Sequence, residues 1–225
     1  KNLTLFLSNG HGEDVCGAAI AAWLAKIAPD KNIVAFPIVG TGSAYQEAGI
    51  PIIGPHKDLP YGGHIWGRPI AILIDVSHGL SLLFKQIKYM KKIAKRVAEV
   101  IAVGDVVPLL YNQFWIKKPL FYLAIAKSAY YRDGRQPVIE PRELKSLEPY
   151  ARTIFLRDRF TWEGARQQCP HLDLRFEGNP MMDNINATRA GFSTLQSPII
   201  GILPGSRKTA YKNLGLLLKV MNSVI

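Results

Sequence analysis

Two short polar stretches carry side chains that can exchange protons, and each follows an apolar run. Residues 8–14, SNGHGED, come directly after the apolar run 3–7. Residues 103–108, VGDVVP, come at the end of another such run. A histidine or carboxylate held at the end of a buried strand can accept a proton from a hydroxyl group. His11 and Asp105 are therefore the candidate catalytic residues.

Each stretch also has a plain structural interpretation. The sequence predicts a helix over 15–28 with Asp14 as its N-cap, and glycines before it would let the backbone turn sharply. In the same interpretation Asp105 caps the next helix and His11 is a solvent-exposed turn residue. The first stretch, residues 8–14, lacks the Lys-Ser/Thr pair and the glycine spacing of the common nucleotide-binding motifs. Its remaining candidate ligand-facing residues are Asn9, Gly10, Gly12, Glu13 and Asp14.

A third stretch, ILPGSRKTAYKN at 202–213, predicts an anion site. Free backbone amides at a helix start attract negative charge, and a guanidinium can grip two phosphate oxygens. Gly205, Ser206 and Arg207 are thus candidates for binding a diphosphate, with Lys208 and Lys212 adding positive charge. The alternative is a capped turn without a ligand.

The elements that must position these residues are predicted from apolar runs long enough for buried strands and separated by helix-length segments. Such a pattern is typical of an α/β domain with a Rossmann-like parallel sheet. Segment 40–70 is rich in Gly and Pro and is expected to form a surface loop. The predicted strands are 3–7, 33–38, 100–103, 120–125, 153–156 and 199–203, and the predicted helices are 15–28, one within 80–98, 161–168 and 214–224.

A polar stretch at 177–198 marks the predicted domain boundary. Residues 1–190 are expected to form one α/β domain. Residues 191–225 are expected to hold a linker and the first strand and helix of a second such domain, and the chain is expected to be a fragment of a longer protein.

The segment 81–100 predicts an amphipathic helix with a strongly basic face, since no Asp or Glu occurs between Val76 and Ala98. A basic face can be merely solvated, or it can adsorb to an anionic membrane with help from Leu82, Phe84 or Tyr89. The cations of this face are Lys85, Lys88, Lys91, Lys92, Lys95 and Arg96.

The composition narrows the class of protein. The 225 residues carry a formal net charge of +11 with a pI near 9.7, which indicates anionic partners. No apolar run is long enough to span a bilayer, and no secretory signal is recognisable, so a cytoplasmic location is expected. The two cysteines lie far apart, so neither a metal site nor a disulfide is expected. No familiar nucleic-acid recognition motif is present, and no nucleic acid partner is expected.

Three stretches, in this order, resemble the lipid-A-disaccharide synthase family: SNGHGED at 8–14, EGNPMMD at 177–183 and ILPGSR at 202–207. The family's Gly-His-Pro-Leu segment has Asn179 here in place of its histidine. In the first loop, Asp14 aligns with the last residue of the family's Gly-Glu-Ala-Ser-Gly-Asp. The family's acidic Pro-Asp-Phe-Asn segment is replaced by GDVVPLL at 104–110, and Ala210 stands where the family has a glutamate.

The resemblance implies GT-B architecture, with two Rossmann-like domains facing across a cleft. It implies an inverting, metal-independent hexosyltransferase without a cofactor, moving a sugar from a nucleotide diphosphate, expected to be UDP, to a lipid-linked acceptor. The first loop and Asp105 would then face the acceptor, and Ser206 and Arg207 the donor diphosphate. The basic helix would hold the enzyme at the anionic inner face of the cytoplasmic membrane.

Three other functions remain open from the sequence. A sugar-nucleotide 2-epimerase shares the same architecture and would need no lipid. A non-catalytic basic domain that binds nucleic acid would show steeply salt-dependent binding instead. A scaffold with a decayed site is the third.

Overall fold

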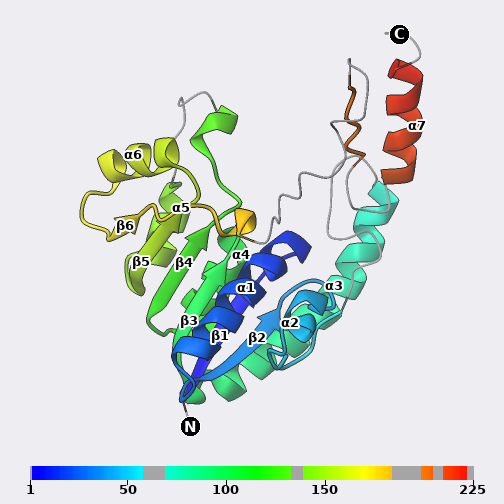
Figure 1. Cartoon of the computed structure of the whole chain (residues 1–225). Helices are drawn as coiled ribbons and strands as arrows, with labels where there is room; N and C mark the ends of the chain where they lie inside the picture. The colour runs from blue at the N-terminus through cyan, green and yellow to red at the C-terminus, as the bar shows by residue number, and fades with distance from the viewer. Residues whose placement is uncertain (1, 58–68, 133–138, 184–198, 205–209, 222–225) are drawn as a thin grey trace. The chain divides into compact units, whose positions relative to one another are not determined.

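The computed structural model describes residues 2–57, 69–132, 139–183, 199–204 and 210–221 (Figure 1). The chain divides into two compact units, Lys1–Ile185 and Asn186–Ile225.

The first unit is built on a six-stranded parallel sheet with the strand order β2-β1-β3-β4-β5-β6. This confirms the predicted α/β class with a Rossmann-like parallel sheet. The chain moves from β1 outward to β2 and then returns to the other side of β1 as β3, so the order reverses between β1 and β3 (Figure 1). In such sheets ligands bind beyond the carboxyl ends of the strands at this reversal. The strands are β1 (Leu3–Ser8), β2 (Asn32–Pro37), β3 (Val97–Val103), β4 (Leu120–Ala124), β5 (Ala151–Leu156) and β6 (Leu174–Arg175).

Helices cover both faces of this sheet, which is why its strands read as continuous apolar runs. On one face, Phe6 packs with Cys16 and Tyr45 of α1 and α2. On the other face, Leu5 packs with residues of α3, α4, α5 and α6, among them Met90. The helices of this unit are α1 (His11–Ile27), α2 (Ser43–Glu47), α3 (Pro69–Ile93), α4 (Val106–Tyr111), α5 (Pro141–Leu147) and α6 (Arg159–Gln168), with shorter turns η1 (Ala94–Arg96), η2 (Asn112–Ile116), η3 (Ala129–Arg132) and η4 (Pro180–Met182).

The predicted start of the first helix was wrong. The α1 helix begins at His11, because Gly10 is its N-cap and the Asp14 backbone N–H closes the first turn onto the Gly10 carbonyl at 2.8 Å. Asp14 is therefore not the cap. It lies inside the first turn, where a nearby acid, Glu13, also complements the positive end of the helix dipole.

The predicted surface loop at 40–70 was also wrong in part. Its residues 43–47 form α2, and the Tyr45 side chain of this helix is fully buried. Tyr45 packs so closely on α1 that a Cβ at Gly17 would clash with its hydroxyl group. The end of the same segment, from Pro69, begins α3, and residues 58–68 lie outside the described residues.

The basic helix is anchored by a buried amide. Gln86 of α3 donates from Nε2 to the Ile38 carbonyl at 2.8 Å and to the Pro55 carbonyl at 3.1 Å. Its Oε1 accepts a hydrogen bond of 2.5 Å from the Tyr111 hydroxyl. Because Ile38 directly follows β2, this part of α3 lies near the carboxyl edge of the sheet, and the helix then runs toward the start of β3 (Figure 1).

In the second unit, the described residues 199–204 have no regular structure, so the predicted strand 199–203 was wrong. A strand needs a partner to satisfy its backbone groups, and no described strand pairs with this segment. The predicted helix 214–224 is present as α7 (Ala210–Met221), which begins four residues earlier.

Candidate functional site

The loops that follow β1 and β3 meet at the point where the strand order reverses. The Asn9 side chain donates from Nδ2 to Asp105 Oδ2 at 3.0 Å. Glu13 fills the space between the loops, since a Cβ at Gly104 would clash with its Cγ and one at Gly10 would lie 2.7 Å from its Oε2. The structure thus confirms that the two predicted loops share one edge of the sheet.

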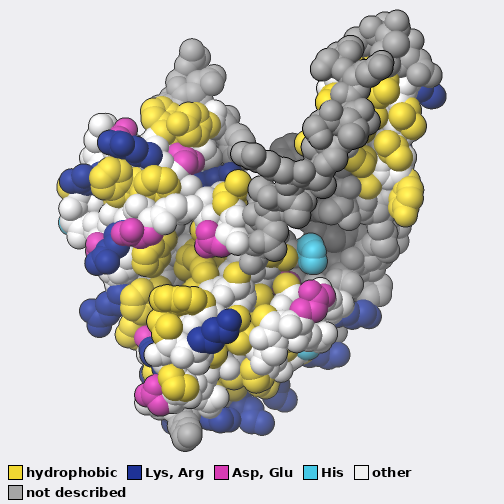
Figure 2. All heavy atoms as spheres, in the orientation of Figure 1, with side chains coloured by type: hydrophobic (Ala, Val, Ile, Leu, Met, Phe, Trp, Pro, Cys, Tyr) yellow, Lys and Arg dark blue, Asp and Glu magenta, His cyan; other side chains and the backbone are white. Residues whose placement is uncertain are grey.

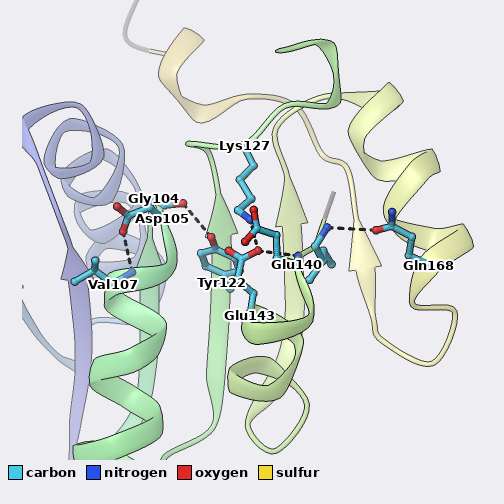
Figure 3. Close-up of polar contacts among 9 residues, drawn as sticks. Gly104, Asp105, Val107, Tyr122, Lys127, Glu140, Glu143 and Gln168 are labelled. Atoms are coloured by element: carbon cyan, nitrogen blue, oxygen red, sulfur yellow. Dashed lines mark hydrogen bonds and ion pairs between the residues drawn. The ribbon is translucent and has the colours of Figure 1, made fainter. Parts of the chain in front are cut away.

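Asp105 has a structural role in the second loop. Its Oδ1 accepts from the Val107 backbone N–H at 2.9 Å, so Asp105 is the N-cap of α4 (Figure 3). The preceding Gly104 has φ +114, a left-handed conformation that favours glycine. The Asp105 side chain stays partly exposed, and each carboxylate oxygen retains a lone pair for a ligand. The helix-capping interpretation is confirmed, and it leaves room for a second role.

Asp14 is in a different environment from Asp105. It is only 2% exposed, and its Oδ1 accepts a hydrogen bond of 2.5 Å from the Ser8 hydroxyl. The Tyr45 hydroxyl in turn donates to Ser8 Oγ at 3.1 Å. Burial raises the pKa of Asp14 to about 6, although the Ser8 hydrogen bond and the nearby His11 and His56 lower it.

His11, the first residue of α1, directly follows the loop after β1, and its side chain is exposed. On the same helix turn, Gly12 faces the turn η4, because a Cβ there would lie 3.9 Å from Met181 Cε. Asn179 caps that turn, its Oδ1 accepting from the Met181 backbone N–H at 3.1 Å. The structure therefore brings the first and second of the three resembling stretches side by side.

The third stretch is only partly described. The diphosphate candidates Gly205, Ser206 and Arg207, and also Lys208, lie outside the described residues. Lys212 is described and is exposed on α7.

All six cations of the basic face are exposed, and none forms an ion pair with another residue in the described part of the chain. Lys and Arg side chains gather along the margin of the molecule where α3 runs (Figure 2). Phe84 is 69% exposed, while Leu82 is half-buried. Gln86 lies near the carboxyl edge of the sheet and Arg96 directly precedes β3. Phe84 and Lys85 therefore lie toward the carboxyl-edge end of this face, and Lys95 and Arg96 lie toward the opposite end.

Sequence reasoning gave no role to Tyr45 or His56 and did not foresee that Ser8 contacts Asp14. Ser8 was counted as part of the first stretch, but its partner Tyr45 lies in a segment expected to be a loop. A tyrosine in a short helix gives no signal of its own, so only the fold brings the pair together.

Within the described residues, no three His, Cys, Asp or Glu side chains gather in a way that could hold a metal ion. Nor is any helix there both long and apolar enough to cross a bilayer.

No protein-family model matches the chain, and no curated protein sequence matches it. Among solved structures, the chain is similar to MurG from Acinetobacter baumannii, with 15% identity and a TM-score of 0.44, over 72% of this chain and 42% of MurG. It is also similar to a UDP-glucose:anthocyanidin 3-O-glucosyltransferase in complex with UDP, with 16% identity and a TM-score of 0.43, over 80% of this chain and 53% of that one. The chain thus spans about half the length of these proteins.

The class of domain is defined by the chain's own sheet and loops. It is a Rossmann-like α/β domain with a candidate site where the loops after β1 and β3 meet.

Proposed function

We propose that the chain belongs to a glycosyltransferase of GT-B architecture that transfers a sugar from a UDP-sugar to a hydroxyl of a lipid-linked acceptor. The observation that carries the proposal is the hydrogen bond between Asn9 and Asp105. This bond joins the loops after β1 and β3 at the strand-order reversal where such folds bind ligands, and the exposed His11 directly follows the first of these loops, which supports the proposal. The resemblance of three ordered stretches to the lipid-A-disaccharide synthase family supports the same function.

The proposed reaction inverts the anomeric carbon. The acceptor oxygen forms a bond to that carbon as the bond to the diphosphate oxygen breaks, and the acceptor proton passes to a base on the protein. Asp105 is the proposed base, because two hydrogen bonds hold its carboxylate in place while it stays partly exposed. His11 is the proposed partner in proton transfer, since a histidine side chain can both accept and donate a proton.

The donor side is assigned to the second unit. Residues 1–190 would form the acceptor-side domain, and 191–225 would begin the nucleotide-sugar-binding domain. Ser206 and Arg207 would stabilise the departing diphosphate with fixed dipoles and a cation, without a metal ion or cofactor.

A transfer assay tests the proposed reaction. The protein as its gene encodes it is incubated with radiolabelled UDP-glucose or UDP-N-acetylglucosamine and a bacterial lipid extract. Label in the lipid phase is expected, and Arg207→Ala is expected to weaken UDP binding by about 1.5–3 kcal/mol, as for a hydrogen bond to a charged group. Cleavage of the donor without any transfer, or conversion of the sugar at C2, would contradict the proposal.

The basic face is proposed to hold the enzyme at the anionic inner surface of the cytoplasmic membrane. Each cation near such a surface contributes about 1 kcal/mol. Sedimentation with phosphatidylglycerol vesicles, release by salt and no binding to phosphatidylcholine vesicles are expected. Replacing Lys88, Lys91, Lys92 and Lys95 with glutamine should remove most of the binding.

Variants at the two ends of the basic face can distinguish adsorption to the membrane from delivery of the lipid acceptor to the site. The pair Phe84→Ser with Lys85→Gln, toward the carboxyl edge of the sheet, is expected to slow transfer from lipid more than the pair Lys95→Gln with Arg96→Gln. If the two pairs of substitutions slow transfer equally, the basic face contributes only adsorption to the membrane.

A further inference from the structure

The buried carboxyl group of Asp14, at the start of α1, has no role in the proposed reaction and no charged partner. In the described part of the chain, no lysine or arginine forms an ion pair with it. The Ser8 hydroxyl is the one hydrogen-bond donor that the described residues offer to its side chain. A buried carboxylate needs an ion-pair partner or several donors, because loss of hydration disfavours its charged form. The fold around Asp14 is therefore suited to the neutral acid.

The surroundings of Asp14 contain no fixed positive charge. The titratable side chains around it are His11 and Glu13 of α1, His56 after β2 and Tyr45 of α2. Burial is the largest influence on the pKa of Asp14 and raises it to about 6, and Glu13 raises it further. The hydrogen bond from Ser8 and the charge of a protonated His11 or His56 lower this pKa but do not outweigh burial. The helix dipole also favours the charged form, by less than burial disfavours it.

The first turn of α1, residues 10–14, is the part of the fold that can bring Asp14 to water most easily. Its N-cap is Gly10, and no side chain caps it. Gly12 lies within the turn, and glycine weakens a helix because it loses more conformational entropy than other residues. The Asp14 backbone N–H closes the turn onto the Gly10 carbonyl at 2.8 Å. Release of this one bond frees the start of the helix while the later turns stay formed.

We propose that ionisation of Asp14 opens the first turn of α1, which makes this turn a pH-sensitive switch at the candidate site. Neutral Asp14 stays buried against Ser8 and the turn is closed. Charged Asp14 favours the open turn, in which the carboxylate reaches water. Because Asn9 directly precedes the turn and His11 lies in it, opening also loosens the contact between the loops after β1 and β3. An effect on sugar transfer rests on the proposed function, whereas opening of the turn does not.

Amide hydrogen exchange of the whole chain between pH 4 and pH 7 tests the switch, with rates corrected for the intrinsic pH dependence of exchange. The opening equilibrium at the backbone N–H of residue 14 is expected to rise about 50-fold over this range in the wild type. In Asp14→Asn it should not depend on pH. In Ser8→Ala, which lacks the hydroxyl that favours the charged form, the rise should be larger than in the wild type.

The matched control is the corresponding amide of α6. The Trp162 backbone N–H closes the first turn of that helix onto the Asp158 carbonyl at 3.0 Å. The Asp158 side chain caps this turn by accepting from the Thr161 backbone N–H at 2.7 Å, so its charged form stabilises the closed turn. Protection of the Trp162 amide should therefore not fall as the pH rises.

Several outcomes would overturn the switch. They are a wild-type α1 turn whose opening does not depend on pH, an equal loss of protection in α6, unchanged pH dependence in Asp14→Asn, or a smaller rise in Ser8→Ala. Ser8→Ala keeps the Asp14 carboxyl group, so it tests the switch even if Asp14→Asn fails to fold. Absence of sugar transfer together with pH-dependent opening would reject the proposed function and leave the switch standing.

Discussion

The loops after β1 and β3 each carry an acidic residue near the start of a helix, and the fold treats the two in opposite ways. Asp105 is partly exposed and caps its helix, with both carboxylate oxygens bonded. Asp14 is buried inside the first turn, bonded to Ser8, and burial raises its pKa to about 6. Similar sequence positions therefore give two different carboxylates. That of Asp105 is held in place and partly exposed, and that of Asp14 is buried and bonded to Ser8 at the end of β1.

The difference teaches that the start of the helix decides the role of the acid. In the β3 loop, the acid directly precedes α4 and caps it. In the β1 loop, Gly10 takes the cap position, so Asp14 is carried one turn into α1 and toward the core.

The largest effect is expected from the contact that joins the loops. Gly104→Ala places a methyl group in a left-handed conformation and against Glu13, and it should lower the free energy of unfolding by about 3 kcal/mol. Gly178 has a similar φ of +103 and open space around it, so Gly178→Ala should cost only the backbone strain, about 1 kcal/mol. Chemical denaturation measures both, and equal losses would show that the loops are not in contact.

The next effect concerns the protonation of Asp14. The pKa of Asp14 in the folded protein, about 6, lies above its ordinary value of 3.8. Protonated Asp14 therefore stabilises the folded state fully below about pH 4, and this stabilisation is lost as the pH rises through 6. The unfolding free energy of Asp14→Asn relative to wild type should therefore increase by about 2 kcal/mol from pH 4 to 7.

Asp158 provides the control of opposite sign. Burial raises the pKa of this carboxyl, but hydrogen bonds from Thr161 and Ser128 outweigh it and hold the pKa below its usual value. The unfolding free energy of Asp158→Asn relative to wild type should therefore fall as the pH rises from acid to neutral. A flat difference for Asp14→Asn would contradict the enclosed environment of Asp14.

The cap on α4 should give a smaller effect. Asp105→Ala leaves the Val107 backbone N–H without its side-chain acceptor, and a loss of about 1 kcal/mol in unfolding free energy is expected. Asp105→Asn should retain most of the stability, since asparagine caps helices equally well. Thermal melts of the two variants check this, and a larger loss for Asn than for Ala would be inconsistent with the capping role.

The smallest effect is the link between the loops themselves. A double-mutant cycle with Asn9→Ala and Asp105→Ala should give a coupling energy of about 0.5–1.5 kcal/mol. Strictly additive effects would mean that the hydrogen bond between them contributes nothing in solution.

The fold could be predicted from the sequence where the signal is local. Continuous apolar runs such as Leu3–Ser8 predict buried parallel strands, and five of the six predicted strands are present. The run 199–203 looks the same in sequence, but a strand also requires a partner, which is not a local property. The start of α1 was misplaced because Gly10 and Asp14 are both acceptable N-caps, and the choice depends on where Asp14 is buried.

The site could be predicted only in part, for a related reason. Asn9 and Asp105 follow neighbouring strands, so their meeting follows from the parallel sheet. Tyr45 reaches the same edge from a short helix that the sequence does not distinguish from a loop. Its contribution depends on burial and on a partner distant in sequence, Ser8.

The most direct test of the proposed base is the rate of sugar transfer by Asp105→Asn. The substitution preserves the cap and the shape of the side chain but removes its ability to take up a proton. Transfer to lipid should fall about 100-fold or more, the contribution of a general base. In the control Asp173→Asn, at an exposed carboxyl before β6, the rate should not change. Wild-type transfer by a folded Asp105→Asn protein would contradict the assignment of the site.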